Sequence, residues 1–187
     1  MDRRLRSSVM TGQKLQDALI EMLREMPFER ITVSALTRRA GINRTTFYLL
    51  YGSIHELLET TWREMVEKAL QGLEPDMFTG KGREWFIRWF ASLMERIQTV
   101  RLFFGIPGFN PYESIHLVFH AMIENHMPDC RGEEDENRKR VAARVYESLV
   151  LAIIRLWLER DGKTTPEDAW RIGNLCVEKG LIALVEN

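Results

Sequence analysis

The chain has 187 residues, 45% of them hydrophobic and 28% charged, a composition that excludes collagen-like, disordered and disulfide-scaffold proteins. Its net charge of −1 is unevenly spread, because residues 1–52 carry nine basic and five acidic side chains while the remainder is net −5, and a basic segment on an acidic body favours a polyanion partner for that segment. Cys130 and Cys176 stand far apart in the sequence, which indicates reduced cysteines. Residues 1–10 lack the apolar core of a signal peptide, and no apolar run approaches the roughly 18 residues of a membrane span. We therefore expect a cytoplasmic protein that does not enter a membrane.

Hydrophobic residues recur at the helical period along almost the whole chain, and no run alternates at period two for long. The pattern therefore predicts an all-α fold of about nine helices. Their expected ranges, in chain order, are 11–25, 33–39, 44–50, 54–70, 83–99, 100–106, 112–126, 136–160 and 166–185.

The second and third predicted helices are short and joined by a tight turn. Thr32 is placed to cap the first of them, and Asn43 the second. Gly41 lies between them, where a left-handed backbone resists a residue with a Cβ atom. Two helices of about seven residues with this turn have the spacing of a helix-turn-helix, in which the second helix reads DNA.

The residues that open the third helix have side chains suited to DNA. Arg44 has the fork of donors that pairs with guanine, and the methyl group of Thr45 suits a thymine methyl. Tyr48 and Tyr51 offer hydroxyl groups at the edge of the same surface. The alternative is a three-helix core without a DNA partner.

The spacing of these residues is similar to the signature of the TetR family, whose usual form is T-V-x-x-I-A-x-x-A-G-V-S-x-G-T-F-Y-x-Y-F-x-S-K-x-x-L. The resemblance covers about the first 58 residues, and later helices match only in number and length. It is carried by Thr32-Val33, Ala40-Gly41-Ile42-Asn43, Thr46-Phe47-Tyr48, Tyr51, Ser53 and Leu57-Leu58.

The resemblance implies a DNA-contacting set in which Tyr48, Tyr51 and Ser34 reach phosphates and Phe47 is core. That expected set is Ser34, Asn43, Arg44, Thr45, Thr46, Tyr48, Tyr51, Ser53 and His55. The sequence departs from the signature at Ile54, where the family often has a phosphate-binding lysine that His55 replaces only in part. An apolar residue at this position is also similar to the pattern of a subgroup of the family whose members include co-activators.

The middle of the chain is rich in aromatic residues, with ten of the chain's 18 between residues 78 and 119. In the family this region encloses an effector cavity, and aromatic side chains with a few polar groups suit a small hydrophobic ligand. The alternative is ordinary core packing, because the aromatic residues also recur at the helical period. The expected ligand-binding set is Trp85, Trp89, Phe90, Phe103, Phe104, Tyr112, His116 and His120.

Four polar residues, Glu113, His116, His120 and Glu124, share one face of the helix predicted over 112–126. Two histidines four residues apart can bind a metal, but no third ligand is evident elsewhere. A polar pocket lining and a structural face are the alternatives, so we expect neither a metal nor a cofactor.

The last two predicted helices have the pattern of a dimer element. Small residues on the final helix would let another helix approach closely, as in a four-helix bundle across a two-fold axis. The alternative is packing within one chain. The expected interface comprises Val145, Leu149, Ala152, Ile153, Leu156, Gly173, Cys176, Val177, Gly180 and Leu184.

These expectations combine into a helix-turn-helix DNA-binding domain over residues 1–54 and an effector-binding and dimerisation domain over residues 55–187. The resemblance implies a homodimeric repressor on a palindromic double-stranded DNA operator, released by a small hydrophobic effector. One alternative is a co-activator or adaptor of the same fold that acts through a protein partner. Another is a DNA-binding dimer without an effector. No motif for catalysis is present, so we expect no enzyme activity.

Overall fold

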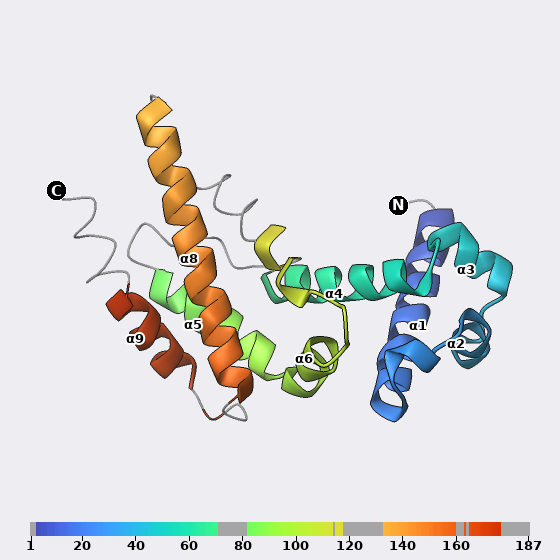
Figure 1. The fold of residues 1–187 in the computed structure, drawn as a ribbon. Helices are drawn as coiled ribbons and strands as arrows, with labels where there is room; N and C mark the ends of the chain where they lie inside the picture. Colours follow the sequence, from blue (N-terminus) through green and yellow to red (C-terminus); the bar gives the residue numbers. More distant parts are fainter. Residues whose placement is uncertain are drawn as a thin grey trace. The chain divides into compact units, whose positions relative to one another are not determined.

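The computed structural model describes residues 3–70, 82–113, 115–117, 133–159, 163 and 165–176. Every regular element in those ranges is a helix, which confirms the expected all-α class (Figure 1). The elements are α1 (Arg3–Glu25), η1 (Phe28–Arg30, a 3-10 helix), α2 (Val33–Ala40), α3 (Arg44–Leu50), α4 (Ile54–Leu70), α5 (Gly82–Met94), α6 (Ile97–Phe104), α8 (Glu133–Glu159) and α9 (Pro166–Cys176). Residues 111–113 and 115–117 are also helical.

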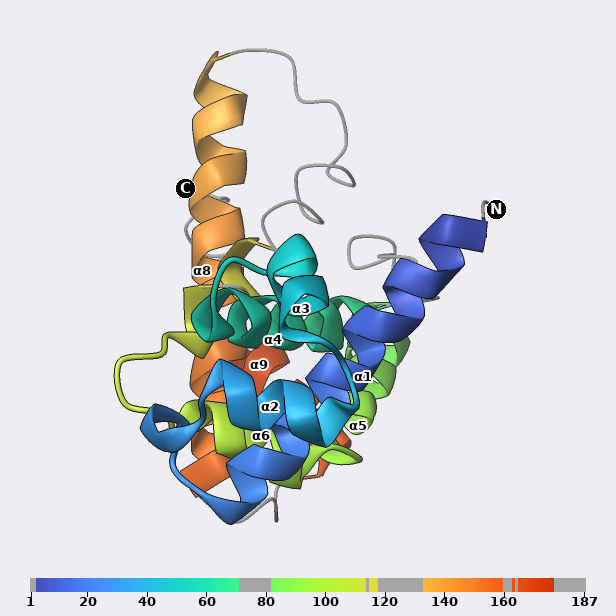
Figure 2. The ribbon, with the colours of Figure 1, turned by 90° about the vertical axis from the view of Figure 1, so that its right-hand side faces the viewer.

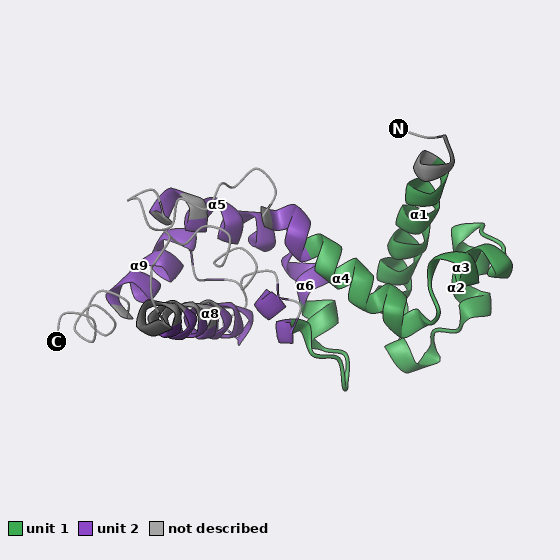
Figure 3. Cartoon of the chain, turned by 90° about the horizontal axis from the view of Figure 1, so that it is seen from above, with its two compact units in different colours: residues 1–65, 101–111 green, residues 66–100, 112–187 purple. Residues whose placement is uncertain are grey.

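The chain divides into two compact units, coloured separately in Figure 3. Unit 1 comprises residues 1–65 and 101–111, and unit 2 comprises residues 66–100 and 112–187. No described helix is both long and apolar enough to cross a bilayer.

In unit 1, α1 packs against α2 and α3, which face the viewer in Figure 2. Each of these helices presents one apolar face inward, as its hydrophobic spacing predicts. The largest fully buried side chains of unit 1 are Leu15, Leu19, Leu36, Phe47, Leu57, Leu58, Trp62 and Phe103.

The ends of α2 and α3 follow from three residues. The Thr32 hydroxyl accepts a hydrogen bond from the Ala35 amide at 3.2 Å and caps α2. Gly41 has a φ of 66° and ends α2 in the left-handed region. The Asn43 side chain accepts from the Thr45 amide at 2.8 Å and starts α3. The predicted caps and turn are thus confirmed.

Residues 101–111 belong to unit 1 because they pack on α4. The Trp62 indole donates a hydrogen bond to the Pro111 carbonyl oxygen over 2.8 Å. Its ring lies 5.1 Å from that of Phe103 and 5.7 Å from that of Phe104, measured between ring centroids. A segment about 40 residues later in the chain therefore completes the core around Trp62.

In unit 2, α9 packs against both α5 and α8 (Figure 1). Phe86 and Phe90 stack at 5.7 Å on α5, and each meets a tryptophan of another helix. Phe86 lies 5.6 Å from Trp170 of α9, and Phe90 lies 5.4 Å from Trp157 of α8. These aromatic contacts join the three helices.

Several predicted helix boundaries were wrong. The helix expected over 100–106 is Ile97–Phe104, and the helix expected over 136–160 is Glu133–Glu159. The helix expected over 11–25 begins at Arg3, because residues 3–10 contain no glycine or proline to stop it, although Val9 and Met10 are exposed and add no buried face. The helix expected over 83–99 ends at Met94, and α6 starts at Ile97. A backbone hydrogen bond from the Arg96 amide to the Leu93 carbonyl oxygen, at 3.0 Å, forms the turn between α5 and α6.

Candidate nucleic-acid interface

The exposed face of α3 lies opposite its buried anchor, Phe47. Arg44, Thr45, Tyr48 and Leu49 are all exposed, with Tyr48 at 52% and Leu49 at 79%. The helix therefore presents a guanidinium, two hydroxyl groups and one aliphatic chain to the solvent. This mixture of donors and apolar atoms can contact base edges as well as phosphates.

The structure exposes most of the residues predicted to contact DNA. Ser34, Asn43, Arg44, Thr45, Tyr48, Ser53 and His55 are exposed, and Thr46 is half-buried. Tyr51 differs, since only 9% of it is exposed. Leu49 was not among the predicted residues, although its spacing from Phe47 already turns it away from the core.

Tyr51 lies in the core of unit 1 beside α1. Its hydroxyl is hydrogen-bonded to the side chain of Gln16, which is also buried. Burial raises the pKa of the Tyr51 hydroxyl above its usual value, and the bond with Gln16 opposes that shift. A Cβ atom on Gly12 would lie 3.2 Å from the Tyr51 hydroxyl oxygen, so glycine leaves room for it. The phosphate contact of Tyr51 stays a prediction.

Arg38 and Arg39 stand next to each other at the end of α2 but differ in their surroundings. Arg39 makes a two-pronged ion pair with Glu25 of α1. Hydrogen bonds from Arg39 lower the pKa of the Glu25 carboxyl, and the same bonds raise the pKa of Arg39. Arg39 thereby makes a structural contact, while Arg38 and Arg44 are further exposed basic residues of α2 and α3.

The N-terminus of α4 is capped by nearby side chains. The Ser53 hydroxyl accepts from the Glu56 amide at 3.1 Å, and the Glu56 carboxylate accepts from the Gly52 amide at 2.7 Å. This reciprocal arrangement resembles a capping box, which the order Ser53-x-x-Glu56 signals in the sequence. An acidic group thus occupies the helix end at which this chain has Ile54 and the TetR signature has a lysine.

His55 lies one residue further along α4. Its ring meets the edge of Phe28 in η1, with centroids 4.9 Å apart, and the residue remains exposed. The predicted contact of His55 with phosphate is untested by this packing.

The residues predicted to bind a ligand fall into both units. Trp89 and Phe90 are fully buried in unit 2, where Tyr112 and His116 are half-buried. Phe103 and Phe104 pack on Trp62 in unit 1 instead. The Trp85 side chain and His120 lie outside the described residues. The common pocket stays a prediction.

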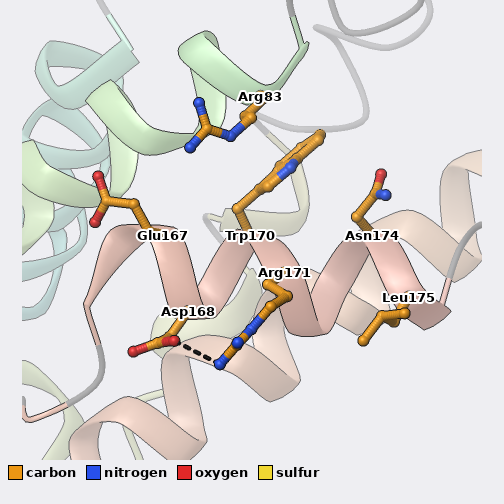
Figure 4. A pocket seen from close by; sticks show the side chains of 7 residues that line it. All are labelled: Arg83, Glu167, Asp168, Trp170, Arg171, Asn174 and Leu175. Atoms are coloured by element: carbon orange, nitrogen blue, oxygen red, sulfur yellow. Dashed lines mark hydrogen bonds and ion pairs between the residues drawn. The ribbon is translucent and has the colours of Figure 1, made fainter.

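Figure 4 shows a surface pocket in unit 2 of about 410 Å³ that the sequence did not suggest. Trp170 and the start of α9 form one side of it, and Arg83 of α5 the other. Arg171 donates to Asp168 at 2.8 Å at its edge. The lining residues are Arg83, Glu167, Asp168, Trp170, Arg171, Asn174 and Leu175. No spacing in the sequence could have indicated this pocket, because it needs the packing of α5 on α9.

The residues predicted to form a dimer interface divide into exposed and internal ones. Val145, Ala152 and Leu156 are exposed on α8, and Leu149 is half-buried. Ile153 is buried, and a Cβ atom on Gly173 would lie 3.2 Å from its Cδ1 atom. The close approach at Gly173 therefore joins α8 and α9 within the chain. The Cys176 side chain, Val177, Gly180 and Leu184 lie outside the described residues.

One contact is described on the polar face around His116. An Arg144 nitrogen lies 3.4 Å from the His116 Nε2 atom. His120 and Glu124 lie outside the described residues, and in the described ranges no three potential metal ligands gather.

Among known proteins, the chain is 25% identical over 176 residues to the uncharacterized HTH-type transcriptional regulator YxbF of Bacillus subtilis (strain 168). The alignment covers 90% of this chain. The chain spans 43% of the length of that relative, so it matches less than half of it. No family model matches the chain.

Proposed function

We propose that the protein is a TetR-like transcription regulator that binds double-stranded DNA through α3. The observation that carries this proposal is the α2-turn-α3 unit, in which Gly41 and Asn43 fix the turn and Arg44, Thr45 and Tyr48 stand exposed. The likeness to a relative named as a helix-turn-helix regulator supports it. On this proposal residues 1–54 form the DNA-binding domain, and the protein acts in the cytoplasm without catalysis.

The proposed binding form is a homodimer on a palindromic operator. An apolar stripe on α8 supports this, since Val141, Val145 and Leu156 are exposed at helical spacing. Two copies would place two recognition helices in successive major grooves, with half-sites about one helical turn apart. Occupancy of the operator would repress transcription. Residues 55–187 would hold the interface and a small hydrophobic effector, whose binding changes the dimer geometry.

The test is selection of bound sequences from random duplex DNA with purified protein at near-physiological salt. An enriched inverted repeat is the expected result, and binding to it should fall steeply as salt rises, because phosphate contacts release counterions. A dimer in solution without any enriched sequence would contradict the proposal.

The second candidate is a co-activator or adaptor of the same fold that binds a protein. The closed start of α4 favours it, because Glu56 and Ser53 occupy the end at which Ile54 replaces a basic residue. This candidate would be supported if the selection enriches no DNA sequence and a component of the transcription machinery co-purifies with the protein. A gel shift with the upstream region of the protein's own gene distinguishes the two.

A further inference from the structure

Leu49 is the most exposed large hydrophobic side chain among the described residues, at 79%. It stands on α3 one turn after Thr45 and next to Tyr48, on the side away from Phe47. Single exposed leucines are common on protein surfaces and need no partner by themselves. This one lies in the last turn of α3, the helix that the proposed function sets in the major groove.

The neighbours of Leu49 decide between two kinds of partner. A protein-docking surface would need a contiguous apolar patch, whereas exposed Thr45 and Tyr48 place hydrogen-bonding groups near Leu49 on the same helix, and Arg44 stands exposed at its start. Exposed Arg38 and Arg44 add positive charge, and Arg39 is neutralised by Glu25. Donors, positive charge and one aliphatic group on a short helix match the major groove of DNA.

In that groove an aliphatic side chain distinguishes bases in only one way. It makes no hydrogen bond, and thymine is the base that presents a methyl group. We infer that Leu49 is a specificity-determining residue that packs on a thymine C5-methyl group in each half-site, with the Thr45 methyl one turn before it on the same face. The inference rests on the proposed function.

The experiment removes that methyl group alone. Thymines of the enriched operator are replaced one at a time by deoxyuridine, and dissociation constants are measured for the full-length protein and for Leu49→Ala. One replacement should weaken the parent by about fourfold, the equivalent of one lost buried methyl group. The same replacement should leave the affinity of Leu49→Ala unchanged. Leu49→Met keeps an apolar chain and should still respond to the loss of the methyl.

The control is Leu117→Ala, the same change at an exposed leucine of unit 2, which should respond to deoxyuridine as the parent does. Equal losses in the parent and Leu49→Ala at every thymine, or an operator without thymine in the half-site, would overturn the inference and leave the proposed function intact. Absence of any enriched sequence would contradict both the inference about Leu49 and the proposed function. Melting curves check that each variant is folded.

Discussion

Both outer nitrogens of the Arg39 guanidinium donate to the two carboxylate oxygens of Glu25, each over 2.6 Å, and so tie the end of α2 to the end of α1. The pair is partly exposed, so solvent screens it and its contribution to stability is small. Its effect is mainly geometric, because it fixes the helix that precedes the turn at Gly41.

Glu25→Gln should therefore lower the melting temperature at pH 7 by at most about 3 °C. Since Arg39 lowers the folded-state pKa of Glu25, this stabilisation is present above the unfolded-state pKa of about 4.3 and is lost as pH falls through the lower folded value. Melting curves of parent and variant should converge at acid pH. Glu29→Gln, at an exposed acid of η1, is the control; a gap that persists below pH 3 would contradict the assignment.

Tyr51→Phe tests whether this hydroxyl serves the core or a phosphate. Removing it leaves the buried Gln16 side chain without that hydrogen bond, so we expect a loss of about 1–2 kcal/mol in the free energy of unfolding. The dissociation constant of the folded variant for DNA should not change. Urea titration and a binding isotherm measure the two effects. Tyr48→Phe, at an exposed hydroxyl, should give the reverse pattern.

Two substitutions on the exposed face of α3 should separate affinity from base preference. Tyr48→Ala should weaken binding to operator and random DNA alike, since a phosphate contact carries no sequence information. Arg44→Ala should relax preference at one base pair, by about 1–3 kcal/mol if it pairs with guanine. Competition binding with single-base operator variants measures both. If both variants bind as the parent does, α3 is not the recognition helix.

The helix-turn-helix could be predicted to within one residue because its boundaries are local. Thr32, Gly41 and Asn43 each act on backbone groups within three or four positions, so their meaning does not depend on the rest of the fold. The break after Met94 could not be predicted in this way. The apolar face continues through the turn to Ile97, and the hydrophobic period is therefore the same with or without the break.

The burial of Tyr51 was not predicted from the sequence, although the aligned signature contains the reason. In the TetR signature the second tyrosine precedes a phenylalanine, and this chain has Leu50 and Tyr51 at those two positions. Tyr51 is thus at the position of the phenylalanine, which accounts for its burial beside Gln16. Likewise, the packing of residues 101–111 on Trp62 depends on distant segments meeting, which no local pattern records.

Gly41→Ala should destabilise the protein by about 1–2 kcal/mol, the cost of placing a residue with a Cβ atom in the left-handed region. No atom lies within 4 Å of the position of that Cβ, so the cost is backbone strain without a clash. Gly41→Asn should cost less, since asparagine tolerates this conformation better. Urea unfolding of the three proteins measures the order, and equal stabilities would mean that the turn differs in solution.

The apolar stripe on α8 leads to a prediction about assembly. Val145→Glu places a charge at a residue that is already 39% exposed, so the fold of the single chain should survive. In the proposed dimer the same charge would be buried and unpaired, at a cost of several kcal/mol. We expect the variant to sediment as a monomer at concentrations at which the parent is a dimer.

Gln98→Glu is the control, because it adds the same charge to an exposed position of α6, outside the α8 stripe of Val141, Val145 and Leu156. It should remain dimeric. Loss of the dimer in Val145→Glu should also abolish tight binding to the inverted repeat while weak binding to a single half-site remains, because each chain keeps its own α3. A dimeric Val145→Glu would instead mean that the stripe is not the interface.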